Sequence, residues 1–397
     1  MGDRALQPRQ GREDTMRIRS GLRLTPRWLP ALLLASVCAS ANAEVGVTND
    51  TILIGRTTGV TGSVAGSIKE NTEAIDAYLA WINKQGGVNG RKVVLKTIDD
   101  AFDPKKAGEN ARKLINDDRV FALFMPRGTP HTEAVLAIAE PAGVPVIAPS
   151  TGAEIFHTPV RPLVFNVRAK YQDEVIAAVR HFSTVAAKRI AFVGPTDSFG
   201  KDALKGFERG MAKEQLTPVL VATFDRAKGD STSTVPDMLK ADPQGVIVAA
   251  SGTAAVTFIK AMRAQGSHAQ FVSLSNNSSA AFVKDLGGDA RGVLMTQVSP
   301  AADSPRTALG REFARVAKPA GATSSYAAME AYCAVKVLVE GLRRAGRDLT
   351  RKRFVEALDG MRKYDLGDME IDYSPNHHTG STFVEMTIIG ANGNFLR

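Results

Sequence analysis

Three segments that combine glycine with hydroxyl side chains are the parts of the sequence best suited to holding a small molecule. They are TGVTGSVAGS at 58–67, RGTP at 127–130 and PSTG at 149–152. Glycine lets the backbone approach a ligand closely, and hydroxyl groups both donate and accept hydrogen bonds. Hydroxyl groups and helix N-termini can hold a carboxylate without being ionised themselves. These segments therefore predict binding of a small acid.

Patterns typical of catalysis and of metal binding are missing from the sequence. It has no GxSxG, GxxxxGK[ST] or HExxH pattern. His377 and His378 are adjacent in the polar loop SPNHHTGS and have no partner at helical i, i+4 spacing. We expect both histidines to lie in a solvated loop. We also expect no catalytic residue, no metal site and no cofactor.

The segments that must position the three loops alternate between short β-rich runs and amphipathic helical stretches. Runs such as GVIVAA are apolar on both faces, as parallel strands covered by helices on both sides are. The predicted strands are 51–56, 92–98, 120–125, 145–148, 189–193, 218–223 and 245–250. The predicted helices between them are 70–85, 104–117, 132–142, 200–215 and 254–265. This alternation predicts an α/β protein with two open parallel sheets.

Ligands of open parallel sheets bind beyond the carboxyl ends of the strands. The loops expected to contact a ligand are therefore 57–67, 126–131, 149–153, 194–200 and 251–254. Near the end of the chain the alternation of strands and helices stops. Residues 369–373 and 383–389 are predicted to form a late antiparallel pair.

Residues 1–43 have the composition of a secretory signal peptide. Four arginines between positions 17 and 27 precede the apolar run WLPALLLASV, and small residues precede a cleavage point after Ala43. We expect export to the periplasm and cleavage there, with either Met1 or Met16 as the start. Lipidation at Cys38 is the alternative, although Val37 suits such a site poorly.

Without residues 1–43 the chain is an ordinary globular sequence. Those residues carry seven arginines and three acidic residues, so the formal net charge falls from +9 to about +5. The remaining basic residues are scattered, which argues against nucleic-acid binding. No run of eighteen apolar residues predicts a membrane-spanning helix. Cys333 becomes the only cysteine, and its apolar helical surroundings predict a buried packing residue without a disulfide.

Several longer motifs, taken in order, resemble the leucine/isoleucine/valine-binding family of type I periplasmic binding proteins. The resemblance covers residues 45–397 and is strongest in WINKQGGVNGRKV and DDAFDPKKA, with further matches at VPVIAPSTGAE, FNVR and DSFG. It implies two Rossmann-like lobes joined by a hinge of three strands. The first lobe would comprise 45–168 and 298–362, and the second 169–297 and 363–397. Such lobes close over a ligand like a clamshell.

The resemblance also implies which residues hold a ligand carboxylate. In amino-acid-binding members a loop hydroxyl and the next loop's Thr and backbone grip this group. The corresponding residues here are Thr129, Ser150, Thr151 and Gly152. An aromatic residue of the family's first loop corresponds to Ser67, which is a departure from the family pattern.

The rest of the implied site differs more. The family's Tyr in the D-x-Y-G segment corresponds to Phe199, and Tyr171 and Tyr326 are candidates for the opposite wall. The acid that pairs with an α-ammonium corresponds to a position near Ala254, where no carboxylate is present. A buried ammonium without a partner is costly, so we expect a small apolar or aromatic acid, with amino acids as the alternative. Acids that could replace the missing one are Glu154, Asp173 and Asp197.

The function that the resemblance implies is capture of a small solute for an ABC permease in the inner membrane, by a monomer. The same lobes could instead present the ligand to a membrane-bound sensor. A neighbouring permease gene would distinguish these two. An enzyme on the same fold is a further alternative, because fold alone does not exclude one.

Overall fold

The computed structural model describes residues 44–397, so the predicted signal peptide and Cys38 lie outside the described residues. The described strands form a five-stranded sheet, a seven-stranded sheet and a small two-stranded sheet. Among residues 44–397, no helix has the length and apolar character needed to cross a bilayer.

The first sheet is parallel throughout, in the order β2-β1-β3-β4-β5. Its strands are β1 (Thr51–Thr58), β2 (Lys92–Asp99), β3 (Ala122–Phe124), β4 (Val146–Ile147) and β5 (Val164–Phe165). The chain proceeds from β1 to one edge and then returns to build the other side. The carboxyl ends of β1 and β3 therefore flank a topological switch point, where ligands of such sheets bind.

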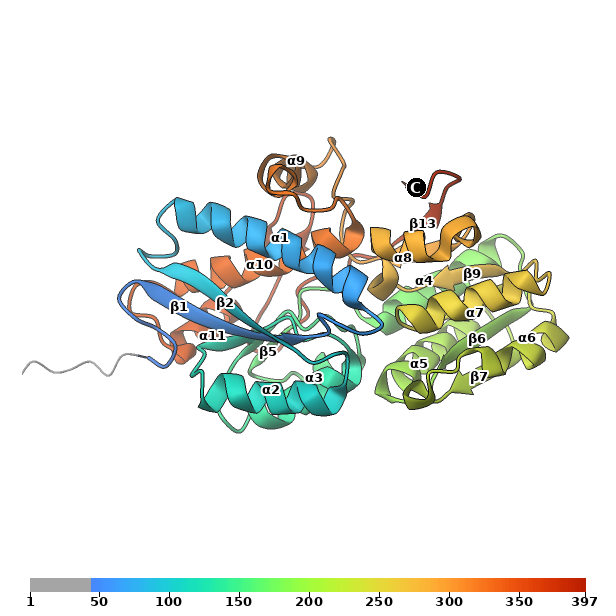
Figure 1. Cartoon of the computed structure of the whole chain (residues 1–397), viewed down its shortest axis with the longest axis horizontal. Helices are drawn as coiled ribbons and strands as arrows, with labels where there is room; N and C mark the ends of the chain where they lie inside the picture. The colour runs from blue at the N-terminus through green and yellow to red at the C-terminus, as the bar shows by residue number, and fades with distance from the viewer. Residues whose placement is uncertain (1–43) are drawn as a thin grey trace, which may run out of the picture. The chain divides into compact units, whose positions relative to one another are not determined.

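Helices cover both faces of this sheet (Figure 1). One face carries α1 (Ala65–Lys84), α10 (Tyr326–Ala345) and α11 (Arg351–Asp359), and the other α2 (Pro104–Asn116) and α3 (Thr129–Ala139). The alternation of side chains along β1 explains both layers. Ile52 and Ile54 pack in the core with α1 and α10, whereas Leu53 packs with α2 and α3.

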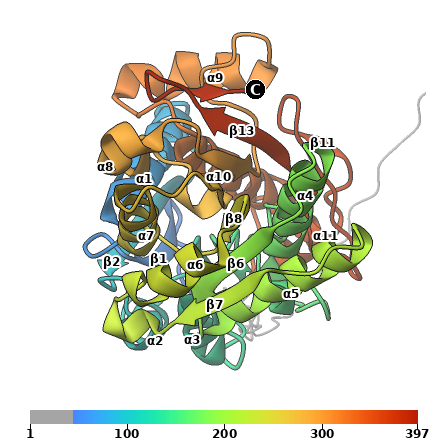
Figure 2. The same ribbon diagram turned by 90° about the vertical axis from the view of Figure 1, so that its right-hand side faces the viewer.

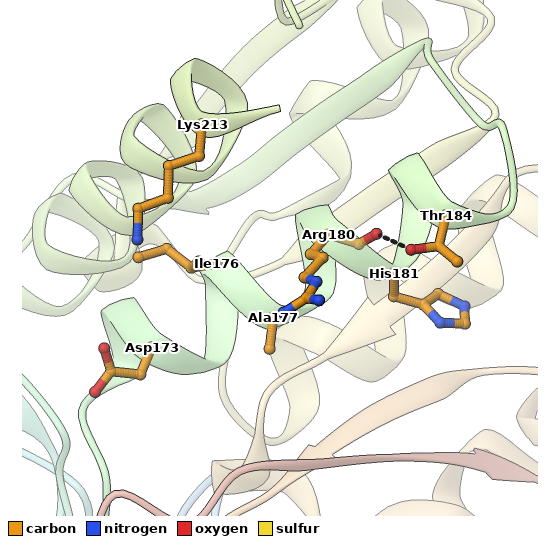
Figure 3. Close-up of a pocket in the computed structure, with 7 residues that line it drawn as sticks. All are labelled: Asp173, Ile176, Ala177, Arg180, His181, Thr184 and Lys213. Atoms are coloured by element: carbon orange, nitrogen blue, oxygen red, sulfur yellow. Dashed lines mark hydrogen bonds between the residues drawn. The ribbon is translucent and has the colours of Figure 1, made fainter. Parts of the chain in front are cut away.

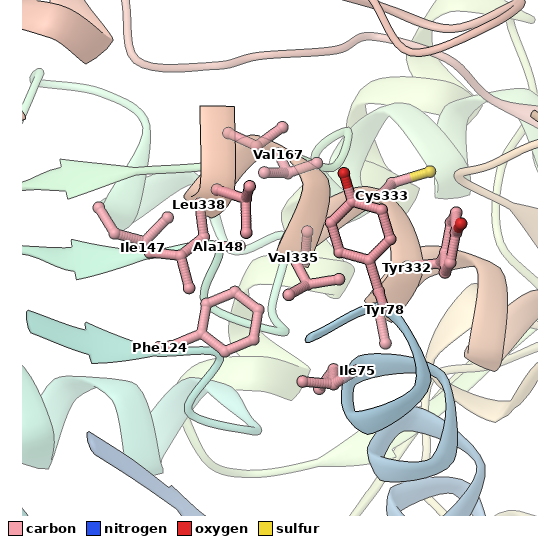
Figure 4. Packing of buried hydrophobic residues seen from close by; sticks show 14 of the residues in the cluster. Ile75, Tyr78, Phe124, Ile147, Ala148, Val167, Tyr332, Cys333, Val335 and Leu338 are labelled. Carbon is pink, nitrogen blue, oxygen red and sulfur yellow. The ribbon is translucent and has the colours of Figure 1, made fainter. Parts of the chain in front are cut away.

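The core between α1 and α10 contains the remaining cysteine (Figure 4). Tyr78 and Tyr332 meet edge to face with ring centroids 5.1 Å apart. Cys333 lies beside them, free and buried, as its apolar surroundings predict. Helix α9 (Ala308–Val316) adds Phe313, which packs on the same Tyr332 ring at 5.3 Å.

The second sheet has the order β14-β13-β10-β9-β8-β6-β7. Its parallel strands are β6 (Ile190–Pro195), β7 (Leu220–Phe224), β8 (Gly245–Val248), β9 (Gln270–Ser273) and β10 (Leu294–Gln297). At one edge β13 (Glu385–Ile389) pairs antiparallel with β10, and β14 (Phe395–Leu396) with β13. Here the switch point lies between β6 and β8.

Helices again cover both faces (Figure 2). One face carries α4 (Tyr171–Thr184) and α5 (Ser198–Lys213), and the other α6 (Val235–Ala241), α7 (Thr253–Ala264) and α8 (Ala280–Leu286). Along β6, Phe192 packs with α4 and α5, while Ala191 and Val193 pack with α6 and α7. The α/β architecture with two mostly parallel, helix-flanked sheets is therefore confirmed.

The predicted late antiparallel pair is wrong. Strand β12 (Glu370–Ile371) pairs with β11 (Tyr364–Asp365), while β13 joins the second sheet. The reason lies in the burial of the segment around β12. Ile371 and Tyr373 are anchored in the core of the first sheet, so that segment cannot follow β13.

The predicted division into lobes places residues 363–397 in the second lobe. Leu366, Met369 and Ile371, however, are buried in the core of the first sheet. The lobe boundaries stay a prediction. We propose that the boundary between the lobes, predicted at residues 362 and 363, lies instead within residues 374–384.

The prediction that both loop histidines are solvated is wrong for His378. Its side chain is 2% exposed and stacks on Phe165 at 4.0 Å between ring centroids. Its Nε2 lies 2.8 Å from Asp359 Oδ1, and its Nδ1 lies 3.0 Å from backbone carbonyl oxygens. The loop folds back over β5 because this imidazole satisfies buried carbonyl groups there, whereas His377 is exposed.

Candidate functional site

A small enclosed cavity lies between the carboxyl ends of the two sheets. The first sheet contributes the loops after β2 and β3, and the second sheet the loops after β6, β7, β8 and β9. The lining residues are Phe102 and residues 127–131 on the first side, and Tyr171, Phe199, Arg226, Ser251 and Asn276 on the second. The cavity therefore lies where parallel sheets of this kind bind ligands. Side chains nearly fill it, so the sheets are drawn together in this arrangement.

The backbone directly after the strands of the first sheet adopts left-handed conformations. The φ angles are 51° at Ala101 and 57° at Phe102 after β2, 51° at Met125 after β3, and 53° at Ala148 after β4. Each such residue costs of the order of 1–3 kcal/mol, and such residues cluster at binding and active sites. The sharp turns bring Phe102 and Arg127 to the cavity wall.

Arg127 is the most buried charge on the cavity wall, with 4% of its surface exposed. Its Nη1 donates to Ser150 Oγ at 3.3 Å, and its Nη2 donates to the backbone oxygen of Asn276 at 2.5 Å. Both acceptors are neutral, and Arg127 forms no ion pair within residues 44–397. Burial lowers the pKa of this guanidinium, the sign of a charge that lacks compensation.

Three of the residues predicted from sequence line the cavity: Thr129, Tyr171 and Phe199. The Thr129 and Thr151 hydroxyl oxygens lie 2.8 Å apart, so each threonine orients the other. Tyr171 and Phe199 form a T-shaped pair with centroids 4.9 Å apart. Ser150 lies behind the lining residues, where its hydroxyl accepts a hydrogen bond from Arg127.

Gly152 does not line the cavity, but it positions a residue that does. A β-carbon at this residue would lie 2.6 Å from the Tyr171 nitrogen and 2.7 Å from the Ala169 oxygen. Its carbonyl oxygen accepts a hydrogen bond from the Tyr171 N–H at 2.8 Å. Only glycine lets the loop pass this closely, so Gly152 fixes the start of α4 and with it the Tyr171 ring.

The structure does not bring Ser67 and Tyr326 into the cavity. Ser67 lines a separate narrow gap, and its hydroxyl donates to the Val64 carbonyl oxygen. Tyr326 lies in another groove, where its hydroxyl donates to Glu385 Oε1 at 3.1 Å. The hydroxyl is engaged there, on the side of the protein that carries the C-terminal strands.

None of the three acids considered as replacements lines the cavity. Glu154 accepts hydrogen bonds from Gln172 and Arg209. Asp173 lines a groove on the outer surface of α4 and α5, together with Arg180, His181 and Lys213 (Figure 3).

Of the three acids, Asp197 contacts residues that line the cavity, and it is already engaged. It caps the N-terminus of α5 by accepting from the backbone N–H groups of Phe199 and Gly200. Its second oxygen accepts a hydrogen bond from the Arg226 guanidinium, which lies 5.6 Å from the Phe102 ring centroid. Asp197 therefore compensates Arg226 and leaves Arg127 without a counter-ion.

His131 is a cavity residue that the sequence reasoning did not single out. Its ring is 1% exposed and stacks on Phe102 at 4.3 Å between centroids, with neither ring nitrogen partnered among the described residues. Burial lowers the pKa of His131 to about 4, so the ring is neutral at neutral pH. A neutral imidazole offers one donor and one acceptor to a ligand. No described group of three or more side chains suits a metal ion.

A second buried arginine lies beside the cavity, where the chain passes from the first sheet to the second. Arg168 Nη2 donates to Glu174 and to Ser275 Oγ, and Nη1 lies 3.5 Å from Glu330 Oε1. Burial alone would lower the pKa of Arg168, but the two carboxylates outweigh it and raise the pKa above its usual range. This charge is compensated within the protein.

Comparison with known proteins decides the family. The profile of the family described as periplasmic binding protein matches residues 51–394. The chain belongs to this family. A crystal structure of a substrate-binding periplasmic protein from Ralstonia solanacearum is 29% identical to this binding protein, with a TM-score of 0.81 over 87% of this chain and 99% of that one.

Two curated relatives are more distant. The binding protein is 23% identical to the "Leu/Ile/Val-binding protein homolog 3" of Brucella melitensis over 74% of its own length and 79% of the relative's. It is 25% identical to an "Amino acid binding protein" of Pseudomonas aeruginosa over 54% of its own length. That second match spans 58% of the relative.

Contacts between the two sheets hold the binding protein closed around its cavity. Glu70 of α1 accepts hydrogen bonds from the backbone N–H groups of Ala280 and Ala281 at the start of α8, at 3.1 and 2.8 Å. Gly252, at φ 54°, lies so close to Ser63 that a β-carbon would be 1.9 Å from its carbonyl oxygen. The loops 57–67 and 251–254 thus meet across the junction, and of these two loops only the second reaches the cavity, through Ser251.

The cavity residues that sequence reasoning missed are Phe102, Arg127, His131, Arg226 and Asn276. Arg127 and His131 flank the predicted Thr129, so the loop was found but not its charged and aromatic members. Arg226 and Asn276 follow β7 and β9. The rule that ligands meet the carboxyl ends of strands would have included these two loops as well.

Proposed function

We propose that this periplasmic binding protein captures a small carboxylate-bearing solute between its two lobes and delivers it to an ABC permease. The observation that carries the proposal is Arg127, a buried guanidinium on the wall of an enclosed cavity, whose hydrogen-bond acceptors in the described part of the chain are neutral oxygens. Charged groups are rarely buried without a partner, and a ligand carboxylate would supply one.

The names of two relatives support this class of ligand. Proteins named for binding amino acids, and leucine, isoleucine and valine in particular, bind solutes that carry a carboxylate. The periplasmic location, the monomeric state and the permease partner are inferred from the family resemblance. Opening of the lobes would admit the ligand, and the closed form would be the one that a permease recognises.

A thermal-shift screen of the chain from Glu44 onward tests the proposal. The panel contains amino acids, short-chain acids and aromatic carboxylates, after unfolding and refolding to remove carried-over ligand. A ligand at about a hundred times its Kd adds about 2.7 kcal/mol of stability and raises the midpoint by a few degrees. A shift with one class of acid supports the proposal, and no shift with any carboxylate contradicts it.

The threonine pair tests the position of the site. Replacing Thr129 and Thr151 together by alanine removes two hydroxyl groups that contact each other at the cavity. We expect ligand affinity to fall by roughly tenfold or more while the far-UV circular dichroism stays unchanged. Unchanged affinity would move the site away from this cavity.

A further inference from the structure

The two charged side chains that line the cavity are both positive. Arg127 and Arg226 both line it, and no aspartate or glutamate among residues 44–397 does. Arg226 is compensated by Asp197, whereas the hydrogen-bond partners of Arg127 within residues 44–397 are Ser150 and the Asn276 carbonyl oxygen. Among the described residues, the wall of the cavity therefore offers an arginine that could pair with a negative charge and no carboxylate that could pair with a positive one.

We propose that Arg127 anchors the ligand carboxylate and that the cavity selects acids that lack an α-ammonium group. The proposal rests on the proposed function above and adds to it the anchoring residue and the specificity. The guanidinium presents a planar set of donors that matches a carboxylate. Because Arg127 already contacts both sheets, a carboxylate bound to it would be held at the junction that closes.

Two buried acids near the cavity, Glu330 and Glu174, pair with Arg168. Glu330 accepts a hydrogen bond from Ser150 and lies 3.5 Å from Arg168. Glu174 is paired with the same arginine. An ammonium group in the cavity would therefore be desolvated beside two guanidinium groups without a carboxylate of its own, which is unfavourable.

The remaining wall suits an apolar or aromatic body. Phe102, Tyr171 and Phe199 supply aromatic surface, and the Phe102 ring is braced by the stacked His131. His131 is neutral and has two unpartnered nitrogens, so it adds a polar contact without adding charge. A keto or hydroxyl substituent on the acid could use these nitrogens, while an ammonium would compete with Arg226 for Asp197.

Matched pairs of acids test the selectivity directly. Isothermal titration of the chain from Glu44 onward compares leucine with 4-methylpentanoate, valine with 3-methylbutanoate, and phenylalanine with 3-phenylpropanoate. Each pair differs only in the α-ammonium group. We expect the acid without it to bind more tightly, by roughly tenfold or more in at least one pair.

Variants at Arg127 test the anchor with the preferred acid. Arg127→Met should weaken binding by roughly a hundredfold, because truncating one partner of a buried charge pair is among the most costly interface changes. Arg127→Lys keeps the charge but not the planar fork, and should recover part of the loss. Arg180→Met removes an arginine from the outer groove and is the matched control. The thermal midpoint of each ligand-free variant shows whether it folds.

The outcomes separate this inference from the proposed function. Tighter binding of the amino acid in every pair that binds overturns the selectivity, while a small-carboxylate receptor still stands. Full affinity in a folded Arg127→Met protein overturns the anchor. Binding of neither member of any pair, together with no shift in the wider screen, overturns both.

Discussion

Arg127 and Arg168 are both almost fully buried, 4% and 2% exposed, yet their electrostatic surroundings are opposite. Arg168 has two carboxylates and a serine hydroxyl around its guanidinium, and its pKa is raised. Arg127 has one serine hydroxyl and one backbone carbonyl, and its pKa is lowered. The two side chains differ in what compensates their charge, although both are buried near the junction between the sheets.

The difference indicates two uses of a buried charge. A guanidinium whose partners all belong to the protein fixes the geometry of the passage between the sheets. A guanidinium without a carboxylate is suited to accept one from outside. The same residue type therefore serves structure in one place and, as we propose, recognition in the other.

The largest loss of stability is expected when Arg168 loses one of its two carboxylate partners. Glu174→Ala leaves Arg168 buried with Glu330 alone at 3.5 Å. We expect the free energy of unfolding to fall by about 3–5 kcal/mol, because an uncompensated buried charge remains. Urea denaturation of the ligand-free protein measures it.

The triple variant Arg168→Met, Glu174→Leu, Glu330→Gln is the control for that prediction. It removes all three charges and leaves no unpaired one, so it should cost less stability than Glu174→Ala alone. If the triple variant is the less stable of the two, the loss in Glu174→Ala does not come from an unpaired charge.

The next effect is the pH dependence of stability that His131, on the cavity wall, produces. The unfolded chain protonates histidine near pH 6.5, whereas buried His131 protonates only near pH 4. Stability present above pH 6.5 is therefore lost as pH falls toward 4. Between pH 6.5 and pH 4 we expect the unfolding free energy of His131→Gln to fall by roughly 3 kcal/mol less than that of the wild type. Urea unfolding at a series of pH values checks it.

His157, which burial holds at a pKa of about 3, provides the contrast. It lies outside the cavity, with Nδ1 2.8 Å from Thr379 Oγ1. His157→Gln should also flatten the pH profile but leave ligand affinity unchanged, whereas His131→Gln should alter both. An identical affinity for the two variants would place His131 outside the ligand contacts.

A smaller change in stability is expected at Arg127 itself. Arg127→Met loses two hydrogen bonds and relieves the desolvation of a charge, so the unfolding free energy without ligand should change by about 1 kcal/mol or less. The same urea experiment gives the value. A loss as large as that of Glu174→Ala would erase the contrast between the two arginines.

A similarly small change in stability is expected at Tyr326, which sequence reasoning placed in the site and the structure places in another groove. Tyr326→Phe removes the hydrogen bond to Glu385 and should lower stability by about 1 kcal/mol. Ligand affinity should stay within about twofold of wild type. A marked loss of affinity would extend the site to this groove.

Much of the fold follows from local pattern. Each apolar run followed by an amphipathic stretch became a strand and a helix, because strands buried on both faces need apolar residues throughout. The late strands were not predictable in this way. The partners of β12 and β13 depend on which core buries Ile371 and Ile389, and the two residues lie in different cores. No local signal carries that choice.

The candidate site was also predictable only in part. Thr129 and Phe199 were proposed from the resemblance to the family, and Tyr171 as a candidate for the opposite wall, and all three line the cavity. Arg127 is adjacent to Gly128 in the same segment, but an arginine is ordinarily exposed. Its burial depends on Asn276, 149 residues further along the chain, so only the closed arrangement reveals it.

The carboxylate of Glu70 covers the amide hydrogens of Ala280 and Ala281 only while α1 and α8 are in contact. Those two amides are therefore a natural reporter of occupancy. Their deuterium uptake should slow when a ligand holds the lobes together and quicken when it leaves. A peptide covering the start of α8 could thus rank candidate solutes by mass spectrometry, without a label and without any assay of transport.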